Sequence, residues 1–383
     1  MDFTFSEEQQ AVREAADGIF AGLVTPERVK EIEATDDRFD RALWAELARA
    51  DLLGLAAPES VGGGGYGMVE LCLILEAQGR SVAPVPLWAT LVLGVLPIGE
   101  FGSDHLLGLL PGVTAGDTVL TAALADVADD LAVGGPGRPS VRATPSGGGY
   151  RLAGTASAVP WAHVADRVLV PAALDDGGVL VAVVDPRADG VTQAWAETTN
   201  REIHPHLTFD LDVVADDLLA TPEAGAGVVA WILDRAWTGL AALQVGVAEA
   251  AVTQTAEYLN TREQFERPLS TFQGTMLRAA DAAIDTEAVR VTLWQAAWRI
   301  DNGLPASRAV TVAAWWASDA GQRVVHAAQH LHGGMGADID YPIHRYFLWG
   351  KQLELLLGGP SAHLARLGTL VVEDLQAGTA VAT

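Results

Sequence analysis

Three zones of different hydropathy pattern follow one another along this 383-residue chain. Apolar residues recur at helical spacing in residues 1–115 and 225–383, whereas residues 116–224 hold short apolar runs separated by Gly, Pro and Asp. Short runs bounded by turn formers are typical of antiparallel strands, and long periodic stretches are typical of packed helices. The pattern predicts an α+β protein with an N-terminal helical domain, a small central antiparallel β domain (a sandwich or a barrel) and a C-terminal four-helix bundle. Few architectures place a β domain between two helical domains.

Local signals define several elements within these zones. Ser6, with Gln9 three residues later, has the pattern of a capping box and is expected to begin the first helix. Pro58 and the glycines that begin at Gly62 lack the Lys-Ser/Thr tail of a P-loop and indicate a connecting loop. Pro268 is expected in the first turn of a bundle helix, where proline is tolerated. The expected strands are TVLTAAL, YRLAGTAS, DRVLVPAAL, GGVLVAVVD and HLTFDLDVV.

Composition excludes several classes of protein. Asp and Glu outnumber Lys and Arg by 49 to 24, and the formal charge of −25 would repel nucleic acid. The single cysteine, Cys72, excludes an intrachain disulfide framework and a cysteine-based metal cluster, and His204 and His206 are expected at a solvated strand end rather than in a metal site. The N-terminus lacks the basic region of a signal peptide, and no uninterrupted apolar stretch reaches the roughly 18 residues of a membrane span. We therefore expect a cytoplasmic protein with neither nucleic acid nor a membrane as partner.

Two motifs offer groups that can bind an anion. HLHGGMG places Gly333 and Gly334 in a tight turn, whose backbone N–H groups can contact a pyrophosphate. A helix C-cap explains the same glycines without any ligand. Arg262 in TREQFERP can donate two hydrogen bonds to a phosphate, or can complement the dipole at a helix end.

These motifs resemble those of the flavin-dependent acyl-CoA dehydrogenases, and the resemblance covers essentially the whole chain. That family's bundle has the pattern R-x-Q/T-F-G-x-x-L…Q, which is similar to TREQFERPLSTFQ, and the pattern H-G-G-x-G…P-x-x-R, which is similar to HLHGGMGADIDYPIHRYF. The family is also similar in its N-terminal segments, here FSEEQQAVREAA and AAPESVGG, and in its α–β–α order. The resemblance implies FAD at a subunit boundary, an acyl-CoA substrate and an electron-transfer flavoprotein as electron acceptor. It also implies that one set of residues grips the pyrophosphate and adenine of FAD, namely Arg262, Gln264, Phe265, Gln273, His330, Gly333 and Gly334.

The chain departs from the family pattern at the catalytic positions. The family's base, a Glu that removes the α-proton of the thioester, aligns with Leu357 or Gly358, and the alternative base position on the first bundle helix aligns with Ala236. None of these residues can accept a proton, so no catalytic residue is assigned. Glu354 precedes them by a few residues, in a different part of the turn.

The flavin-ring side departs from the family as well. LTAALADVADD stands where the family has a T-E-P-x-A-G-S-D-like loop, and ASAVPWAH stands where a W-I-T-like strand contacts the ring through its backbone. Pro160 in that second segment has no N–H to offer, and His330 stands where the family often has Gln. The chain therefore resembles the base-lacking subunit of the actinobacterial α2β2 acyl-CoA dehydrogenases that act on steroid side-chain thioesters.

Three functions follow from this resemblance. The first and most favoured is an enzyme subunit that a homologous catalytic partner completes in an α2β2 heterotetramer. The second is a self-sufficient homotetrameric dehydrogenase with an unusual base such as Glu354, and the third is a scaffold or acyl-thioester-binding protein without chemistry. The bundle helix from Val228 to Tyr258 is apolar on nearly every face, so we expect a large subunit interface to cover it.

Overall fold

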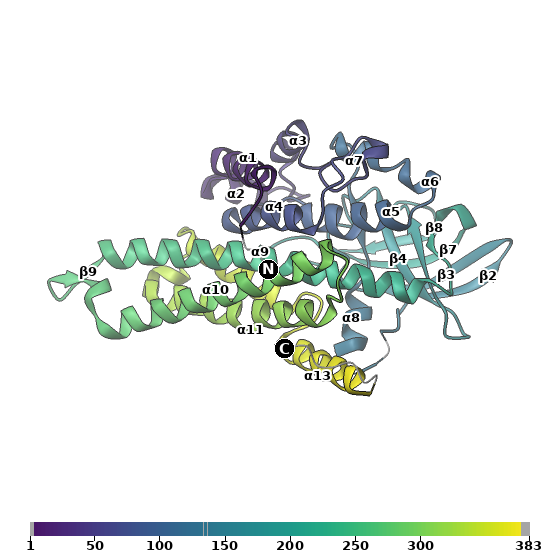
Figure 1. Ribbon diagram of the computed structural model, residues 1–383. Coiled ribbons are helices and arrows are strands. Elements are labelled where there is room, and N and C mark those ends of the chain that lie inside the picture. The colour runs from purple at the N-terminus through teal and green to yellow at the C-terminus, as the bar shows by residue number, and fades with distance from the viewer. Residues whose placement is uncertain (1–3, 133, 136, 377–383) are drawn as a thin grey trace.

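The structure is a computed structural model that describes residues 4–132, 134–135 and 137–376. The long C-terminal helices run side by side, the β-sheet lies at one end of the molecule, and the N-terminal helices cover one side of the bundle (Figure 1). The order of a helical, a β and a helical zone, predicted from the sequence, is confirmed.

Helix α4 (Met68–Ser81) is buried along most of its length, because it packs between α1 (Glu7–Leu23) on one side and the bundle helices α9 (Gly225–Thr261) and α10 (Gln273–Asp301) on the other. Helix α1 begins as predicted, because Ser6 Oγ accepts the backbone N–H of Gln9 at 3.2 Å and Gln9 Oε1 accepts that of Ser6 at 3.0 Å. The other elements of this zone are α2 (Pro26–Glu33), α3 (Arg41–Arg49), η1 (Glu59–Val61), the π-helix η2 (Trp88–Val95), α5 (Leu96–Phe101), α6 (Asp104–Leu107) and α7 (Leu110–Thr114).

The central sheet is mixed rather than purely antiparallel. Its strands are β1 (Leu120–Ala122), β2 (Arg142–Ser146), β3 (Gly149–Ala156), β4 (Arg167–Ala173), β5 (Val179–Val184), β6 (Val191–Ala194), β7 (His206–Val213) and β8 (Leu218–Ala220), with α8 (Ala125–Ala132) and η3 (Ala215–Asp217) between them. The order is β6-β7-β3-β2-β4-β5-β8, with β1 beside β4. Strands β1 and β2 run parallel to β4, and the other pairs are antiparallel. The expectation of an antiparallel sheet fails at these two pairs because β1 enters the sheet from the helical domain and β2 enters it after α8, so neither strand is joined to β4 by a hairpin.

The C-terminal zone is a bundle of α9, α10, α11 and α12, extended by α13. Its elements are α9 (Gly225–Thr261), β9 (Glu263–Gln264), β10 (Arg267–Pro268), η4 (Leu269–Thr271), α10 (Gln273–Asp301), α11 (Ser307–His332), η5 (Gly333–Ala337), α12 (Ile343–Leu355) and α13 (Pro360–Gln376).

Pro268 lies outside the helix that it was expected to begin. It pairs with Glu263 in the β9–β10 hairpin, and the backbone N–H of Leu269 donates to the carbonyl oxygen of Arg262 at 2.9 Å. This pairing holds Pro268 in an extended conformation, with φ −59° and ψ 144°. Helix α10 therefore begins only at Gln273.

Helix α9 is covered within the chain. It packs against α4, η2, α10, α11 and α12, and most of its apolar side chains are buried. The expectation that a subunit interface covers this helix is therefore wrong, because the chain supplies the covering helices itself. Exposed apolar side chains lie instead on α10, at Met276, Leu277, Ile284 and Val291.

Two helical stretches, Gly225–Thr261 and Ile343–Gln376, have the length and composition of a membrane span. Neither stretch is an uninterrupted apolar run, so the criterion of about 18 consecutive apolar residues does not identify them. The core helix of a soluble protein passes the same test, and 67 % of the most apolar window of the first stretch is buried.

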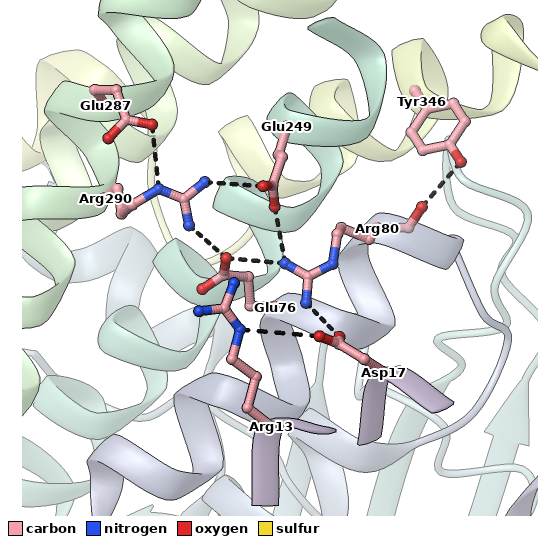
Figure 2. Close-up of polar contacts among 8 residues, drawn as sticks. All are labelled: Arg13, Asp17, Glu76, Arg80, Glu249, Glu287, Arg290 and Tyr346. Atoms are coloured by element: carbon pink, nitrogen blue, oxygen red, sulfur yellow. Dashed lines mark hydrogen bonds and ion pairs between the residues drawn. The ribbon is translucent and has the colours of Figure 1, made fainter. Parts of the chain in front are cut away.

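A network of buried charges joins the N-terminal helices to the bundle (Figure 2). Glu76 of α4 is 2 % exposed and accepts hydrogen bonds from Arg80, at 3.0 Å, and from Arg290 of α10. Arg80 also donates to Glu249 of α9 at 2.8 Å and to Asp17 of α1 at 2.5 Å. One buried carboxylate thus lies at the junction of four helices, where its charge is offset by two guanidinium groups.

We predict that Glu76→Gln lowers the free energy of unfolding by about 1.5–3 kcal/mol, because it removes the more buried of the two carboxylates that Arg80 and Arg290 share and leaves only Glu249 between them. Urea denaturation followed by tryptophan fluorescence measures the change. Glu287→Gln is the matched control: this carboxylate also contacts Arg290, but its side chain is 64 % exposed, and its loss should cost less than about 1 kcal/mol. Equal shifts of the two variants would contradict the prediction.

Candidate functional site

The β9–β10 hairpin connects α9 to α10 and projects beyond the end of the bundle (Figure 1). Its turn residues, Phe265 and Glu266, have φ values of +53° and +63°. Two left-handed residues form the turn that suits a tight hairpin, but this conformation normally favours Gly, Asn or Asp. The chain thus holds two unfavourable residues in a conformation that the pairing of Gln264 with Arg267 and the edge-to-face contact of Phe265 with Phe272 help to maintain.

The predicted binding residues of this hairpin are all accessible. Arg262, Gln264, Phe265 and the first residue of α10, Gln273, are exposed, and Phe265 is 87 % exposed. The Arg262 guanidinium makes no ion pair with any described residue, whereas its backbone N–H donates to the carbonyl oxygen of Tyr258 at 2.8 Å. A fixed backbone with an unpaired guanidinium is suited to a charge-assisted contact with an anion.

The predicted glycine turn begins where α11 ends. Gly333 has φ +59° and ψ −135°, a conformation that a β-carbon disfavours, and a β-carbon on Gly333 or Gly334 would meet nothing within 4 Å. The turn is therefore open to solvent. It borders a cleft of about 460 Å³, lined by His326, Gln329, His330, Gly333, Ala337 and Phe347.

The hairpin and the glycine turn lie at the same end of the bundle. Helix α10 runs back from the hairpin, and α11 returns antiparallel to α10, so that the C-terminal end of α11 approaches the N-terminal end of α10 (Figure 1). The structure thus places both predicted anion-binding motifs on one part of the surface.

The two positions that correspond to a catalytic Glu lie close together in an apolar environment. Ala236 is fully buried, Leu357 is 6 % exposed, and Trp237 Nε1 donates to the Leu357 carbonyl oxygen at 2.9 Å. A β-carbon on Gly358 would lie 3.6 Å from the ring of His363. Burial, assisted by the charge of Arg366, lowers the pKa of His363 to about 4. The ring is neutral near pH 7, and the described residues place no carboxylate side chain in contact with it.

The Glu354 carboxylate is paired with a neighbouring residue of its own helix. It forms an ion pair with Lys351, one turn earlier on α12. Its charge also acts on His326 of α11. Burial and the charge of Lys351 lower the pKa of His326, and the charge of Glu354 opposes this shift. Glu354 therefore lies among polar groups of α11 and α12, apart from Leu357 and Trp237.

The two segments of the β domain that were compared with flavin-binding elements have other structures here. LTAALADVADD forms β1 and the start of α8, and residues 157–163 form a turn rather than a strand. The backbone N–H groups of Val159 and Trp161 donate to the carbonyl oxygens of Pro205 and Ile203, at 2.9 and 3.2 Å, and Pro160 has none. No backbone donor of residues 159–161 is therefore free for a ligand.

A narrow cavity of only about 20 Å³ lies beside this turn. The side chains of Trp88, Trp161 and Trp349 occupy the space around it. A cavity of this size holds one water molecule, and two buried atoms on its walls, Gln78 Oε1 and His204 Nδ1, have no protein partner. The sequence did not reveal this cavity, because its walls come from five separate segments of the chain, within residues 78–89, 160–161, 200–204, 240–243 and 349–356.

The two imidazoles of the HPH segment have hydrogen-bond partners within the chain. His204 pairs with Glu202 at 3.1 Å, and His206 Nδ1 accepts the backbone N–H of Ala158 at 3.2 Å. His206 begins β7, as predicted, but His204 is 1 % exposed rather than solvated. Among the described residues, no group of three or more His, Cys, Asp or Glu side chains could hold a metal ion.

Comparison with known proteins finds close similarity over the whole chain. The chain is 40 % identical to acyl-CoA dehydrogenase FadE27 of Mycobacterium tuberculosis, over 97 % of this chain and 99 % of the relative, and 36 % identical to FadE28 of the same organism, over 96 % and 98 %.

Three solved structures are also similar. A variant of the Tcur3481–Tcur3483 steroid ACAD has a TM-score of 0.89 at 46 % identity, over 97 % of this chain and 99 % of the other. The ChsE4–ChsE5 complex from Mycobacterium tuberculosis has a TM-score of 0.90 at 39 % identity, with the same coverage. A structure titled as the electron transferring flavoprotein of Acidaminococcus fermentans has a TM-score of 0.88 at 26 % identity, over 98 % and 100 %.

Two family models match as well: the acyl-CoA dehydrogenase N-terminal domain over residues 6–117 and the C-terminal domain over residues 223–367. Together with the relative that is 40 % identical along its length, they show that the chain belongs to the acyl-CoA dehydrogenase family, the FAD-dependent oxidoreductases that act on CH–CH bonds.

Proposed function

We propose that this chain is the base-lacking subunit of a heteromeric acyl-CoA dehydrogenase: it grips the pyrophosphate and adenine of FAD, and a homologous partner supplies the catalytic Glu. One contrast carries the proposal. The bundle end of this chain has an open, shallow cleft of about 460 Å³ beside the glycine turn, whereas the turn of the β domain borders a narrow cavity of about 20 Å³.

The bundle end fits the diphosphate part of FAD. Arg262 has an unpaired, exposed guanidinium, and Gly333 and Gly334 leave their backbone uncovered. A guanidinium and the backbone of a glycine turn are the groups that proteins use for phosphate. Gln264, Phe265, Gln273 and His330 complete the proposed grip. FAD, when bound, accepts the hydride that leaves the substrate.

The β domain does not fit the flavin ring. The cavity beside Pro160 and Trp161 is far too small, and Val159 and Trp161 have already committed their backbone N–H groups. We infer that the ring lies against the partner subunit, so that the two chains together form one site.

The positions of this chain that align with the family's catalytic Glu also favour a site that is shared between two subunits. Removal of an α-proton needs a base within hydrogen-bond reach of that carbon. Ala236, Leu357 and Gly358 cannot act as a base, and Glu354 is paired with Lys351. The partner must therefore supply the carboxylate.

The titles of two similar structures favour a partner and a substrate class. Both name two components, Tcur3481–Tcur3483 and ChsE4–ChsE5, and the first is called a steroid ACAD. We therefore propose an α2β2 assembly that acts on the CoA thioester of a steroid side chain, in the cytoplasm, with an electron-transfer flavoprotein as acceptor. The proposed domains are residues 1–115, 116–224 and 225–383.

We predict that Arg262→Ala weakens FAD binding by about 1.5–3 kcal/mol, because it removes a charge-assisted contact to the pyrophosphate. The flavin absorbance of the purified complex gives the FAD content, and circular dichroism checks that the fold survives. Arg308→Ala is the control, since Arg308 lies at the end of α11 that is remote from the glycine turn and pairs with Asp374. Unchanged flavin content in Arg262→Ala would show that Arg262 is only a helix-end residue without a role in FAD binding.

We predict that Glu354→Gln leaves the turnover of the complex within a few-fold of the unmodified enzyme, because its carboxylate serves only the pair with Lys351. Replacement of the partner's catalytic Glu by Gln should instead lower turnover by about 10²–10⁴-fold, the usual contribution of a general base. Steady-state assays of both complexes with FAD bound measure this. An inactive Glu354→Gln complex that retains FAD would locate the base in this chain.

Assembly provides a further test. Leu277, Ile284 and Val291 recur every seventh residue along the exposed face of α10 and are 58 %, 67 % and 49 % exposed. Such a row of apolar residues is typical of a helix that packs against another subunit. We predict that Ile284→Glu lowers the mass of the co-expressed complex from that of a tetramer, as measured by light scattering. Val214→Glu, at an exposed apolar position of the β domain, should leave the mass unchanged, and a tetramer that survives Ile284→Glu would exclude this face as the interface.

A further inference from the structure

His332 is a buried ionisable residue for which the proposed function has no use so far. It is the last residue of α11, it directly precedes Gly333, and it is 2 % exposed. Its ring stacks on Tyr258 of α9, with centroids 4.4 Å apart and an angle of 25° between the planes. The ring of Tyr341 lies 5.3 Å away on another side.

The hydrogen bonds of His332 define its tautomer. Its Nε2 lies 3.3 Å from Thr255 Oγ1, and the Thr255 hydroxyl donates its single hydrogen to the Ala251 carbonyl oxygen at 2.6 Å. Nε2 must therefore carry the hydrogen and donate to Thr255. Nδ1 is buried without a partner, and burial lowers the pKa of the ring. His332 is thus a buried ring that is held by one stack and one long hydrogen bond.

These contacts connect the two elements that are proposed to bind the diphosphate, the glycine turn at Gly333 and the hairpin residue Arg262. On one side His332 is joined by a peptide bond to Gly333 of the glycine turn. On the other side it stacks on Tyr258, whose carbonyl oxygen accepts the backbone N–H of Arg262 at 2.8 Å. His332 is therefore a side chain through which the end of α11 contacts the last turns of α9, next to the start of the hairpin.

We propose that His332 is a positioning residue: it sets the placement of the glycine turn relative to Arg262, and so determines how tightly this end of the bundle binds a diphosphate. The proposal rests on the proposed function, because it requires that these two elements bind the diphosphate of FAD. His332 does not contact the ligand; it acts through Arg262 and Gly333. Because pre-placed groups lose less freedom on binding, loss of the stack should weaken diphosphate binding more than it changes the fold.

ADP and adenosine are the probes, because only ADP carries the diphosphate. Their affinities are measured by equilibrium dialysis against the co-expressed complex after removal of FAD. His332→Ala removes the stack and the hydrogen bond and should weaken ADP binding about tenfold, with adenosine binding nearly unchanged. His332→Phe keeps the stack and should restore most of the ADP affinity, which also provides a fold-preserving variant. Circular dichroism and the melting temperature of the apo complex are followed in parallel.

Thr255→Val removes only the hydrogen-bond acceptor and should have a smaller effect on ADP than His332→Ala. Its matched control is Thr286→Val, because Thr286 is likewise buried and donates to the carbonyl four residues earlier, but has no histidine partner. Thr286→Val should leave ADP affinity unchanged. An equal effect of the two valine variants on ADP binding would count against a role of the His332 bond.

A double-mutant cycle separates positioning from other roles. If His332 acts through Arg262, the His332→Ala, Arg262→Ala double variant should bind ADP little more weakly than Arg262→Ala alone. Fully additive losses would overturn the positioning role. Normal ADP affinity in His332→Ala, with weakened binding in Arg262→Ala, would overturn this inference and leave the proposed function intact. Normal affinity in both single variants would overturn the proposed function itself.

Discussion

Helices α4 and α9 approach each other so closely that a β-carbon on Gly246 would lie 2.0 Å from the carbonyl oxygen of Glu76, and one on Gly79 would lie 2.2 Å from that of Leu243. Only glycine permits this contact, and it has two consequences for the rest of the molecule. It places the Glu76 carboxylate between Arg80 and Arg290, where a buried charge finds its partners. It also aligns the N-terminal helices with the bundle, so that Trp88 Nε1 reaches the carbonyl oxygen of Ala236 at 3.0 Å. The wall of tryptophans beside the small cavity follows from this alignment.

The fold was predictable from the sequence wherever the signal is local. The capping box at Ser6, the five apolar strands and the long helices of the bundle were all recognised, because each depends on neighbouring residues. The strands β2, β6 and β8 were missed, since RATPS, VTQA and LLA are too short or too exposed to show a pattern. The covering of α9 could not be predicted either: an apolar helix looks the same in sequence whether its own chain or another chain covers it.

The candidate site was predictable only in part. The family resemblance identified the hairpin, the glycine turn and the positions without a base, because each is a contiguous motif. The contrast between an open cleft and a narrow cavity depends on Trp88, Trp161 and Trp349, which lie far apart in the sequence and meet only after folding. The same holds for His332, which the motif contains but whose contact with Tyr258 requires the antiparallel return of α11. Motifs thus indicate candidate binding groups, and packing determines the space beside them.

The hairpin at the tip of α9 and α10 combines exposure with backbone strain. Each of Phe265 and Glu266 holds a left-handed conformation, which costs an ordinary residue roughly 1–2 kcal/mol. Such a segment opens with a free energy far below that of global unfolding, and its amides exchange with solvent while the helices remain intact. If this tip holds a ligand, as proposed, fraying of the hairpin would release the ligand without melting any helix. Ligand retention and the stability of the fold would then be separately adjustable properties.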